Sequence, residues 1–113
     1  MVTLAAGQVV TVRFPFSDLS QSKRRPAVVL AGAGRGDWIL CQITSKSYAD
    51  AQAIPLKNSD FVRGSLNLIS YARPGKLFTA SESLIATELG ELQDATFKQI
   101  VDAVIELLRS QVP

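Results

Sequence analysis

The sequence predicts a mainly β protein: a small antiparallel sheet or barrel with one helix at the C-terminal end. Two observations lead to this expectation. Short apolar segments follow one another at close spacing and are separated by turn residues, as in all-β domains. A helical spacing of apolar residues appears only near the end of the chain, so strands do not alternate with helices as they would in a doubly wound fold.

The first half of the chain is expected to contain three strands. Apolar and polar residues alternate over 9–14, which is typical of a half-buried strand. The polar segment 15–25 is expected to be a loop, either one that closes over a ligand or a plain connector. The continuous apolar run 27–31 suits the middle of a sheet, and a glycine-rich turn at 32–37 leads to a strand at 38–45.

The second half is expected to continue the sheet with shorter segments. Ala53–Leu56 fits an edge strand, because Pro55 cannot donate a hydrogen bond to a neighbouring strand. The other expected elements are a turn at 58–60, a strand at 65–73, a turn at 74–75, a returning strand at 76–79 and a segment at 84–92 that fits a short strand.

The chain is expected to end in an amphipathic helix that begins with Asp94 as its cap and runs to about Arg109. Asp102 and Glu106 are expected to face solvent. The helix is expected to lie on the open face of the sheet, because an apolar stripe needs an apolar partner. The residues of that stripe are Phe97, Ile100, Val101, Val104, Ile105 and Leu108.

Length and composition predict one globular domain, residues 1–113, with a cytoplasmic location. The chain has 113 residues, of which 47% are hydrophobic and 19% charged, as in folded domains. A disulfide within the chain is excluded because Cys41 is the single cysteine, and we expect Cys41 to be a small core residue. We expect no membrane association, since there is neither a leader pattern nor a long apolar run.

Histidine is absent from the chain, so the commonest acid–base group and metal ligand is missing. No carboxylates have the spacing of a metal site either. The sequence therefore predicts a site with no metal and no cofactor.

The charges are unevenly distributed along the chain. Residues 1–81 carry ten Lys and Arg against four Asp and Glu, whereas residues 82–113 carry two against six. The basic part is where an anionic partner would be steered. The alternative is an ordinary surface with a solvated acidic helix.

Two arginines precede prolines at the ends of predicted strands, Arg25 before Pro26 and Arg73 before Pro74. Proline biases the preceding residue toward extended backbone, which gives each arginine a defined direction. Thr44 lies at the end of the strand that follows Arg25. If these strands are neighbours, the three side chains share one cleft.

Such a cleft would suit a phosphodiester. A guanidinium donates two parallel hydrogen bonds to phosphate oxygens, and a hydroxyl adds a further donor. Together these groups would stabilise the extra negative charge of phosphodiester cleavage. Phe16 is the aromatic residue expected to contact a base from a loop. The other expected substrate-binding residues are Lys23, Arg24, Ser45 and Lys46.

At these residues the chain resembles the MazF/PemK/Kid toxin family of toxin–antitoxin systems. The resemblance covers nearly the whole chain. It lies in the segments Gly7–Pro15, Lys23–Leu30, Cys41–Ser45, Gly64–Leu66 and Ser70–Arg73 and in the C-terminal helix.

The resemblance implies a small SH3-like barrel of the CcdB/MazF type that forms a homodimer. It implies sequence-specific cleavage of single-stranded mRNA without metal, by attack of the ribose 2′-hydroxyl. Arg25 and Thr44 would be the catalytic pair, and Arg73 would belong to the RNA-binding groove. It also implies a cognate antitoxin whose acidic tail lies in the basic groove.

Some assignments stay open in the sequence. Gly75 stands where family members carry an acidic residue, so no acid–base role is carried over to it. Lys23, Lys46 and Tyr71 are the candidates for a general base, since Arg25 stays protonated. Two other functions remain: a CcdB-like toxin that binds DNA gyrase without catalysis, and an inactive barrel that binds RNA or antitoxin.

Overall fold

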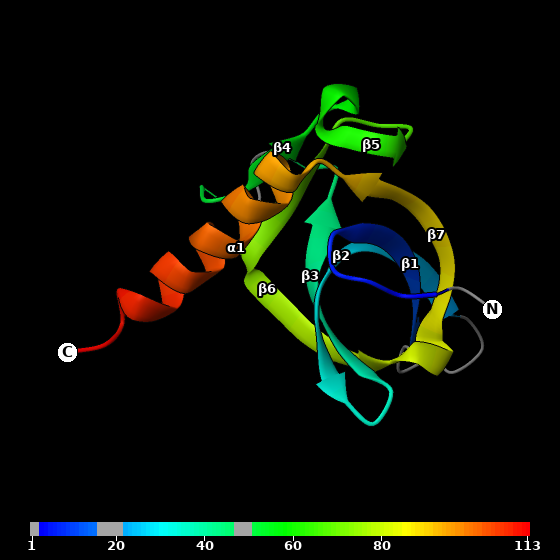
Figure 1. The fold of residues 1–113 in the computed structure, drawn as a ribbon, viewed down its shortest axis with the longest axis horizontal. Coiled ribbons are helices and arrows are strands. Elements are labelled where there is room, and N and C mark those ends of the chain that lie inside the picture. Colours follow the sequence, from blue (N-terminus) through cyan, green and yellow to red (C-terminus); the bar gives the residue numbers. More distant parts are fainter. Residues whose placement is uncertain (1–2, 16–21, 47–50) are drawn as a thin grey trace.

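In the computed structural model, the described residues contain seven strands that form one antiparallel sheet in the order β4-β6-β3-β2-β1-β7-β5 (Figure 1). The structure describes residues 3–15, 22–46 and 51–113, without the side chains of residues 14, 15, 22 and 23. The strands are β1 Gln8–Pro15, β2 Ser22–Gly34, β3 Asp37–Thr44, β4 Ile54–Leu56, β5 Phe61–Gly64, β6 Ser70–Ser81 and β7 Ile85–Leu92. Two 3-10 helices, η2 Asn58–Asp60 and η3 Glu82–Leu84, precede β5 and β7, and the helix α1 spans Asp94–Arg109.

The mainly β fold with a C-terminal helix is confirmed. The sheet is strongly curled, so that β6 and β7 lie on different sides of the central strands (Figure 1). β4 is an edge strand and contains Pro55, as expected. The segment 84–92 contains the strand β7, and residues 58–60 form a tight helical turn.

The predicted loop 15–25 is too long at both ends. Pro15 belongs to β1, and β2 begins at Ser22. Arg24 and Arg25 pair with Arg13 and Val12 of β1, so backbone pairing overrides the polar composition of this segment. β2 also continues to Gly34, which shortens the predicted turn at 32–37.

The predicted turn at Pro74–Gly75 is wrong, because both residues lie inside β6. Cys41 pairs with Leu77, whereas Ile43 pairs with Ala72. Five steps along β6 therefore face two steps along β3, which makes a large β-bulge. A bulge accommodates a proline that cannot donate to the ladder, so the strand bends here instead of reversing.

The predicted strand at 65–73 is wrong in its first half. β5 ends at Gly64 and β6 begins at Ser70. Residues 65–69 form a connector between them, although their apolar residues alternate. β5 is paired with β7, and β6 with β3 and β4, so the connector links two distant positions in the sheet.

The two faces of the curled sheet bury separate apolar clusters. Val9 belongs to one cluster and Val10 to the other, as expected for adjacent residues of a strand. Cys41 is fully buried, which confirms its expected place in the core, and its thiol donates a hydrogen bond to the carbonyl oxygen of Arg73 at 3.1 Å. The first cluster contains Val9, Val28, Cys41, Ile43, Ile54, Leu56, Phe61, Ala72, Leu92 and Ile100. The second contains Val10, Val12, Ala27, Val29, Leu40, Ala80 and Ile85.

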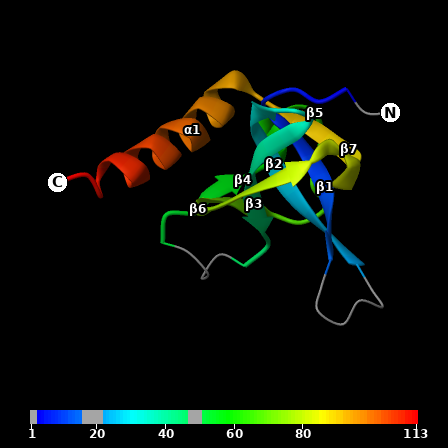
Figure 2. The same cartoon turned by 90° about the horizontal axis from the view of Figure 1, so that it is seen from below.

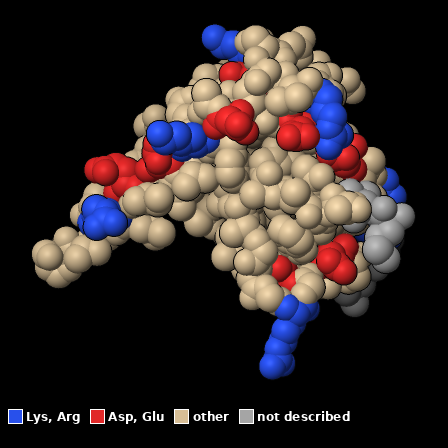
Figure 3. All heavy atoms as spheres, viewed as in Figure 1, with Lys and Arg blue, Asp and Glu red and all other residues tan. Residues whose placement is uncertain are grey.

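The helix α1 packs against β6 and then extends beyond the sheet (Figures 1 and 2). Ile100 and Val104 are buried, but Ile105 is 46% exposed and Leu108 60% exposed. The predicted apolar stripe is thus covered only in part, because the helix is longer than the surface beneath it. Acidic and basic side chains follow one another along α1, whereas the middle of the same face of the molecule carries none (Figure 3).

The start of α1 is fixed by η2 instead of by its own cap. Gln93 is the N-cap residue in place of the expected Asp94, and its side-chain amide donates to the carbonyl oxygen of Phe61 at 3.2 Å. Asp94 lies in the first turn, where its charge favours the helix N-terminus. The hydroxyl of Thr96 donates to a carboxylate oxygen of Asp60 at 2.9 Å.

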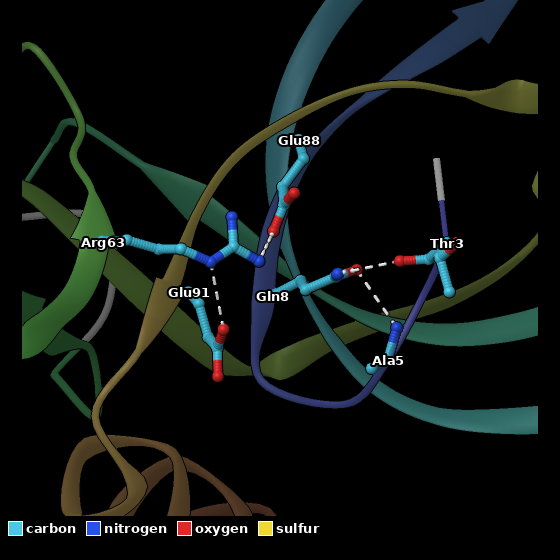
Figure 4. A network of polar contacts seen from close by, with 6 residues as sticks. All are labelled: Thr3, Ala5, Gln8, Arg63, Glu88 and Glu91. Carbon is cyan, nitrogen blue, oxygen red and sulfur yellow. Dashed lines mark hydrogen bonds and ion pairs between the residues drawn. The ribbon is translucent and has the colours of Figure 1, made fainter. Parts of the chain in front are cut away.

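A polar cluster joins β5 to β7 beside the N-terminal segment (Figure 4). Arg63 forms ion pairs with Glu88 and Glu91 of β7. The hydrogen bond with Glu88 raises the pKa of Arg63 above its usual value. Gln8, which is buried, accepts a hydrogen bond from the backbone N–H of Ala5 at 3.1 Å and donates one to the carbonyl oxygen of Thr3 at 2.9 Å.

Two facing glycines allow β5 and β7 to approach closely at the start of the connector. Gly64 has φ +71° and pairs with Gly90. A Cβ on Gly64 would overlap the backbone oxygen of Leu89, and one on Gly90 would lie 2.6 Å from the backbone oxygen of Arg63. The direction in which the chain enters the connector therefore depends on these glycines.

We expect Gly64→Ala to lower the free energy of unfolding by about 3 kcal/mol, through a left-handed backbone and a backbone clash together. Gly34→Ala is the matched control, because Gly34 also has positive φ (+90°) but has open space around it. It should lose about 1–2 kcal/mol from backbone strain alone. Urea unfolding measures both. Equal losses in the two variants would contradict the close approach.

Candidate functional site

A cleft of about 360 Å³ lies where β2 begins and β3 ends. Three segments form it: the start of β2, the end of β3 with the residues that follow, and the connector between β5 and β6. It is lined by Arg24, Arg25, Pro26, Gln42, Ile43, Thr44, Ser45, Lys46, Leu66, Asn67, Leu68 and Ser70.

Arg25 and Thr44 meet in this cleft because β2 and β3 are paired neighbours. Ala27 pairs with Gln42 in the antiparallel ladder. Two residues further toward the end of the sheet, the same register places Arg25 opposite Thr44. Both side chains then lie on one face of the two strands, since residues two apart share a face. Both residues line the same cleft, and their catalytic roles stay a prediction.

The hydroxyl oxygen of Thr44 accepts a hydrogen bond from the backbone N–H of Lys46 at 3.2 Å. This bond fixes the position of the oxygen and leaves its hydrogen free to be donated to another group. Arg24, Ser45 and Lys46 also line the cleft, as the sequence predicted for substrate-binding residues.

Arg73 does not line the cleft, which corrects the expectation that it shares one site with Arg25 and Thr44. The reason is its register. Thr44 pairs with Tyr71 of β6, so Arg73 lies two residues further from the rim, where the bulge of β6 begins. Phe16 lies outside the described residues, and so does the side chain of Lys23.

The connector is the part of the site that sequence reasoning missed. Leu66, Asn67 and Leu68 were expected to belong to a regular strand, yet they form one wall of the cleft. The alternating apolar residues predicted a strand for this segment, whereas the segment is a connector between two strands. The pair Gly64 and Gly90 is the only sequence signal of its departure from the sheet, and it becomes visible only once β5 is known to pair with β7.

The described lining of the cleft is strongly cationic. Arg24, Arg25 and Lys46 line it, and no Asp or Glu is among the described lining residues. Both arginines are exposed residues at the start of β2, so their charges lie at the rim of the sheet. Cations concentrated in a concave surface attract an anion more strongly than the same charges spread over a flat surface.

The arrangement supplies the kinds of donor that a phosphate group accepts. A guanidinium fits two phosphate oxygens, and the Thr44 hydroxyl adds a donor from the opposite strand. Within residues 3–15, 22–46 and 51–113, no group of three His, Cys, Asp or Glu side chains is placed to hold a metal ion. None of the described helices has the length and apolar character needed to cross a membrane.

Fold and site together define a small, curled β-sheet protein with a cationic cleft at one end of its central strands. Residues 5–108 match the sequence profile of the PemK-like, MazF-like toxins of type II toxin–antitoxin systems. The chain therefore belongs to this toxin family. No curated protein sequence matches the chain significantly.

Solved structures of similar fold come from several bacteria. An endoribonuclease of a mycobacterial species, solved with its cognate antitoxin, has a TM-score of 0.71 and 20% identity over 100% of both chains. A MazE–MazF structure from Deinococcus radiodurans has a TM-score of 0.74 and 20% identity over 92% of this chain and 94% of that one. The toxin MazF-mt6 of Mycobacterium tuberculosis has a TM-score of 0.70 and 15% identity, covering 90% and 96%. These likenesses confirm the MazF-like fold.

Proposed function

We propose that this protein is the toxin of a toxin–antitoxin pair and cleaves single-stranded RNA at specific sequences. The observation that carries the proposal is that Arg25 and Thr44 line the same cationic cleft. Family membership supports it, and so do the similar endoribonuclease structures. Neither the family match nor those structures points to a gyrase-binding toxin.

The cleft residues suggest how cleavage proceeds. The Arg25 guanidinium binds two oxygens of the scissile phosphate, and the Thr44 hydroxyl donates to it from across the cleft. The ribose 2′-hydroxyl attacks the adjacent phosphorus and releases its proton to solvent water, the bond from phosphorus to the 5′ oxygen breaks, and the 5′ oxygen takes up a proton from water, so that the step balances. The products are a 2′,3′-cyclic phosphate and a 5′-hydroxyl. Arg25 stabilises the extra negative charge of the transition state, so the chemistry needs no metal.

Arg25→Ala should reduce the rate of RNA cleavage by about 10²–10³, because the main stabiliser of the transition-state charge is lost. The assay uses purified protein, a mixed RNA pool and EDTA, and maps the new 5′ ends. Thermal melting should remain nearly unchanged, since Arg25 is exposed and outside both core clusters.

Arg35→Ala is the matched control for charge, because Arg35 is exposed in the turn between β2 and β3 and does not line the cleft. It should cleave at the wild-type rate. An Arg25→Ala protein that cut RNA as fast as wild type would refute the assignment. A wild-type protein that bound RNA without cutting it would instead indicate the inactive RNA-binding barrel.

Binding of uncleavable 2′-deoxy oligonucleotides should weaken steeply with salt, because phosphate contacts release counterions. Lys46→Gln should reduce the slope of log K against log salt by about 0.7, the value for one phosphate contact on a single strand. Lys98→Gln, on the exposed surface of α1, should leave the slope as it is. Fluorescence anisotropy at several salt concentrations measures it. Equal slopes for wild type and Lys46→Gln would remove Lys46 from the interface.

We also propose that two copies form a dimer and that the antitoxin places an acidic segment in the cleft. The exposed apolar residues on the C-terminal half of α1, Ile105 and Leu108, provide a surface that a second copy would cover. The cationic lining of the cleft favours an acidic segment of the antitoxin over a neutral one. Such a segment would exclude RNA by occupying the phosphate site.

Leu108→Lys should weaken the dimer about tenfold or more, because a buried ammonium loses its hydration. Val62→Lys is the matched control, since Val62 is similarly exposed but lies on β5. Sedimentation equilibrium gives the dissociation constants of both. A wild-type protein that sedimented as a monomer at all concentrations would contradict the proposed dimer.

A further inference from the structure

The two walls of the cleft differ in chemistry. The wall formed by β2 and the end of β3 carries Arg24, Arg25 and Lys46, whereas the connector wall carries Leu66, Asn67 and Leu68 and no charge. A nucleotide has the same two-part character, with a charged phosphate and a flat base that has polar groups along its edge. The cleft volume, about 360 Å³, lies within the usual range for small-molecule sites.

The connector wall is held at both ends. At one end, Gly64 has φ +71° and lies so close to the backbone of β7 that a Cβ would not fit. At the other end, the hydroxyl of Ser70 donates to the carbonyl oxygen of Leu68 at 2.9 Å, and Ser70 is only 5% exposed. These contacts hold the two ends of the connector, so residues 66–68 span between two anchored points.

Within this wall, the side chains of Asn67 and Leu68 are presented to the ligand. Leu68 lines the cleft and is 67% exposed, so its side chain presents an apolar surface there. The Asn67 amide makes no hydrogen bond with any other described residue. It therefore offers one donor group and one acceptor beside an apolar surface.

We propose that Asn67 reads the identity of one RNA base while the opposite wall holds the neighbouring phosphate. The proposal rests on the ribonuclease function above. Single-stranded RNA is recognised by bases that are splayed out, packed on side chains and hydrogen-bonded along their edges. Leu68 supplies the packing surface, and the Asn67 amide pairs with a donor and an acceptor on the base edge. Asn67 is thus a specificity-determining residue of the cleft.

Asn67→Leu removes both hydrogen-bonding groups at nearly constant volume. The preference for one base, at a single position near the cut, should fall about tenfold, the lower range for loss of a bidentate contact. Preferences at the other positions should stay as in wild type. The experiment cleaves a random RNA pool with each protein and compares base frequencies around the mapped cuts.

Asn67→Asp gives a directed change at the same position. A carboxylate has two acceptors and no donor, which complements the adjacent N1–H and N2–H donors of guanine. The frequency of guanine at this position should therefore rise relative to the other bases, even if the added negative charge slows cleavage overall. Asn58→Asp makes the same change at an exposed residue of η2 and should keep the wild-type preferences.

The outcomes separate the inference from the proposed function. If wild type cuts no RNA, the ribonuclease proposal fails. If wild type cuts at a defined sequence and Asn67→Leu keeps every base preference, the role of Asn67 is refuted and the ribonuclease proposal stands. A loss of base preference spread evenly over all positions would also refute the role of Asn67, because such a loss would indicate a general distortion of the cleft.

Discussion

The antiparallel pairing of β2 with β3 is the interaction on which the rest of the site depends. Its register buries Val28 and Cys41 in one core cluster and Ala27 and Leu40 in the other. A slip by one residue would exchange these faces, so burial on both sides fixes the register. The same register carries Arg25 to the rim opposite Thr44. Core packing thus sets the geometry of the cationic cleft.

The two walls of the cleft belong to different parts of the fold, which suits them to the different roles proposed for them. The cationic wall is continuous with the central strands of the sheet, whereas the uncharged wall is a connector between β5 and β6, two strands that are far apart in the sheet. The proposed phosphate chemistry depends on positive charges at a defined place, and β2 carries two of them. A connector tolerates sequence change better than a core strand does.

Elements whose structure depends on residues close in the sequence were predicted correctly. Alternation at 9–14, the apolar run at 27–31 and the helical spacing after Asp94 all lie in the expected elements. The same reasoning placed Arg25 and Thr44 together, since it needed only neighbouring strands. It failed where pairing with another strand decides. β2 begins at Ser22 because β1 supplies partners, and Pro74 lies in a bulge of β6 opposite β3. Residues 65–69 leave the sheet at the close contact of Gly64 with β7.

The most direct measurement of the central claim is a crystal structure of the protein with an RNA that carries a 2′-deoxy sugar at the cleavage position. The phosphate following that sugar should lie between the Arg25 guanidinium and the Thr44 hydroxyl, within hydrogen-bond distance of both. RNA bound on another surface, with the cleft between β2, β3 and the connector empty, would contradict the account.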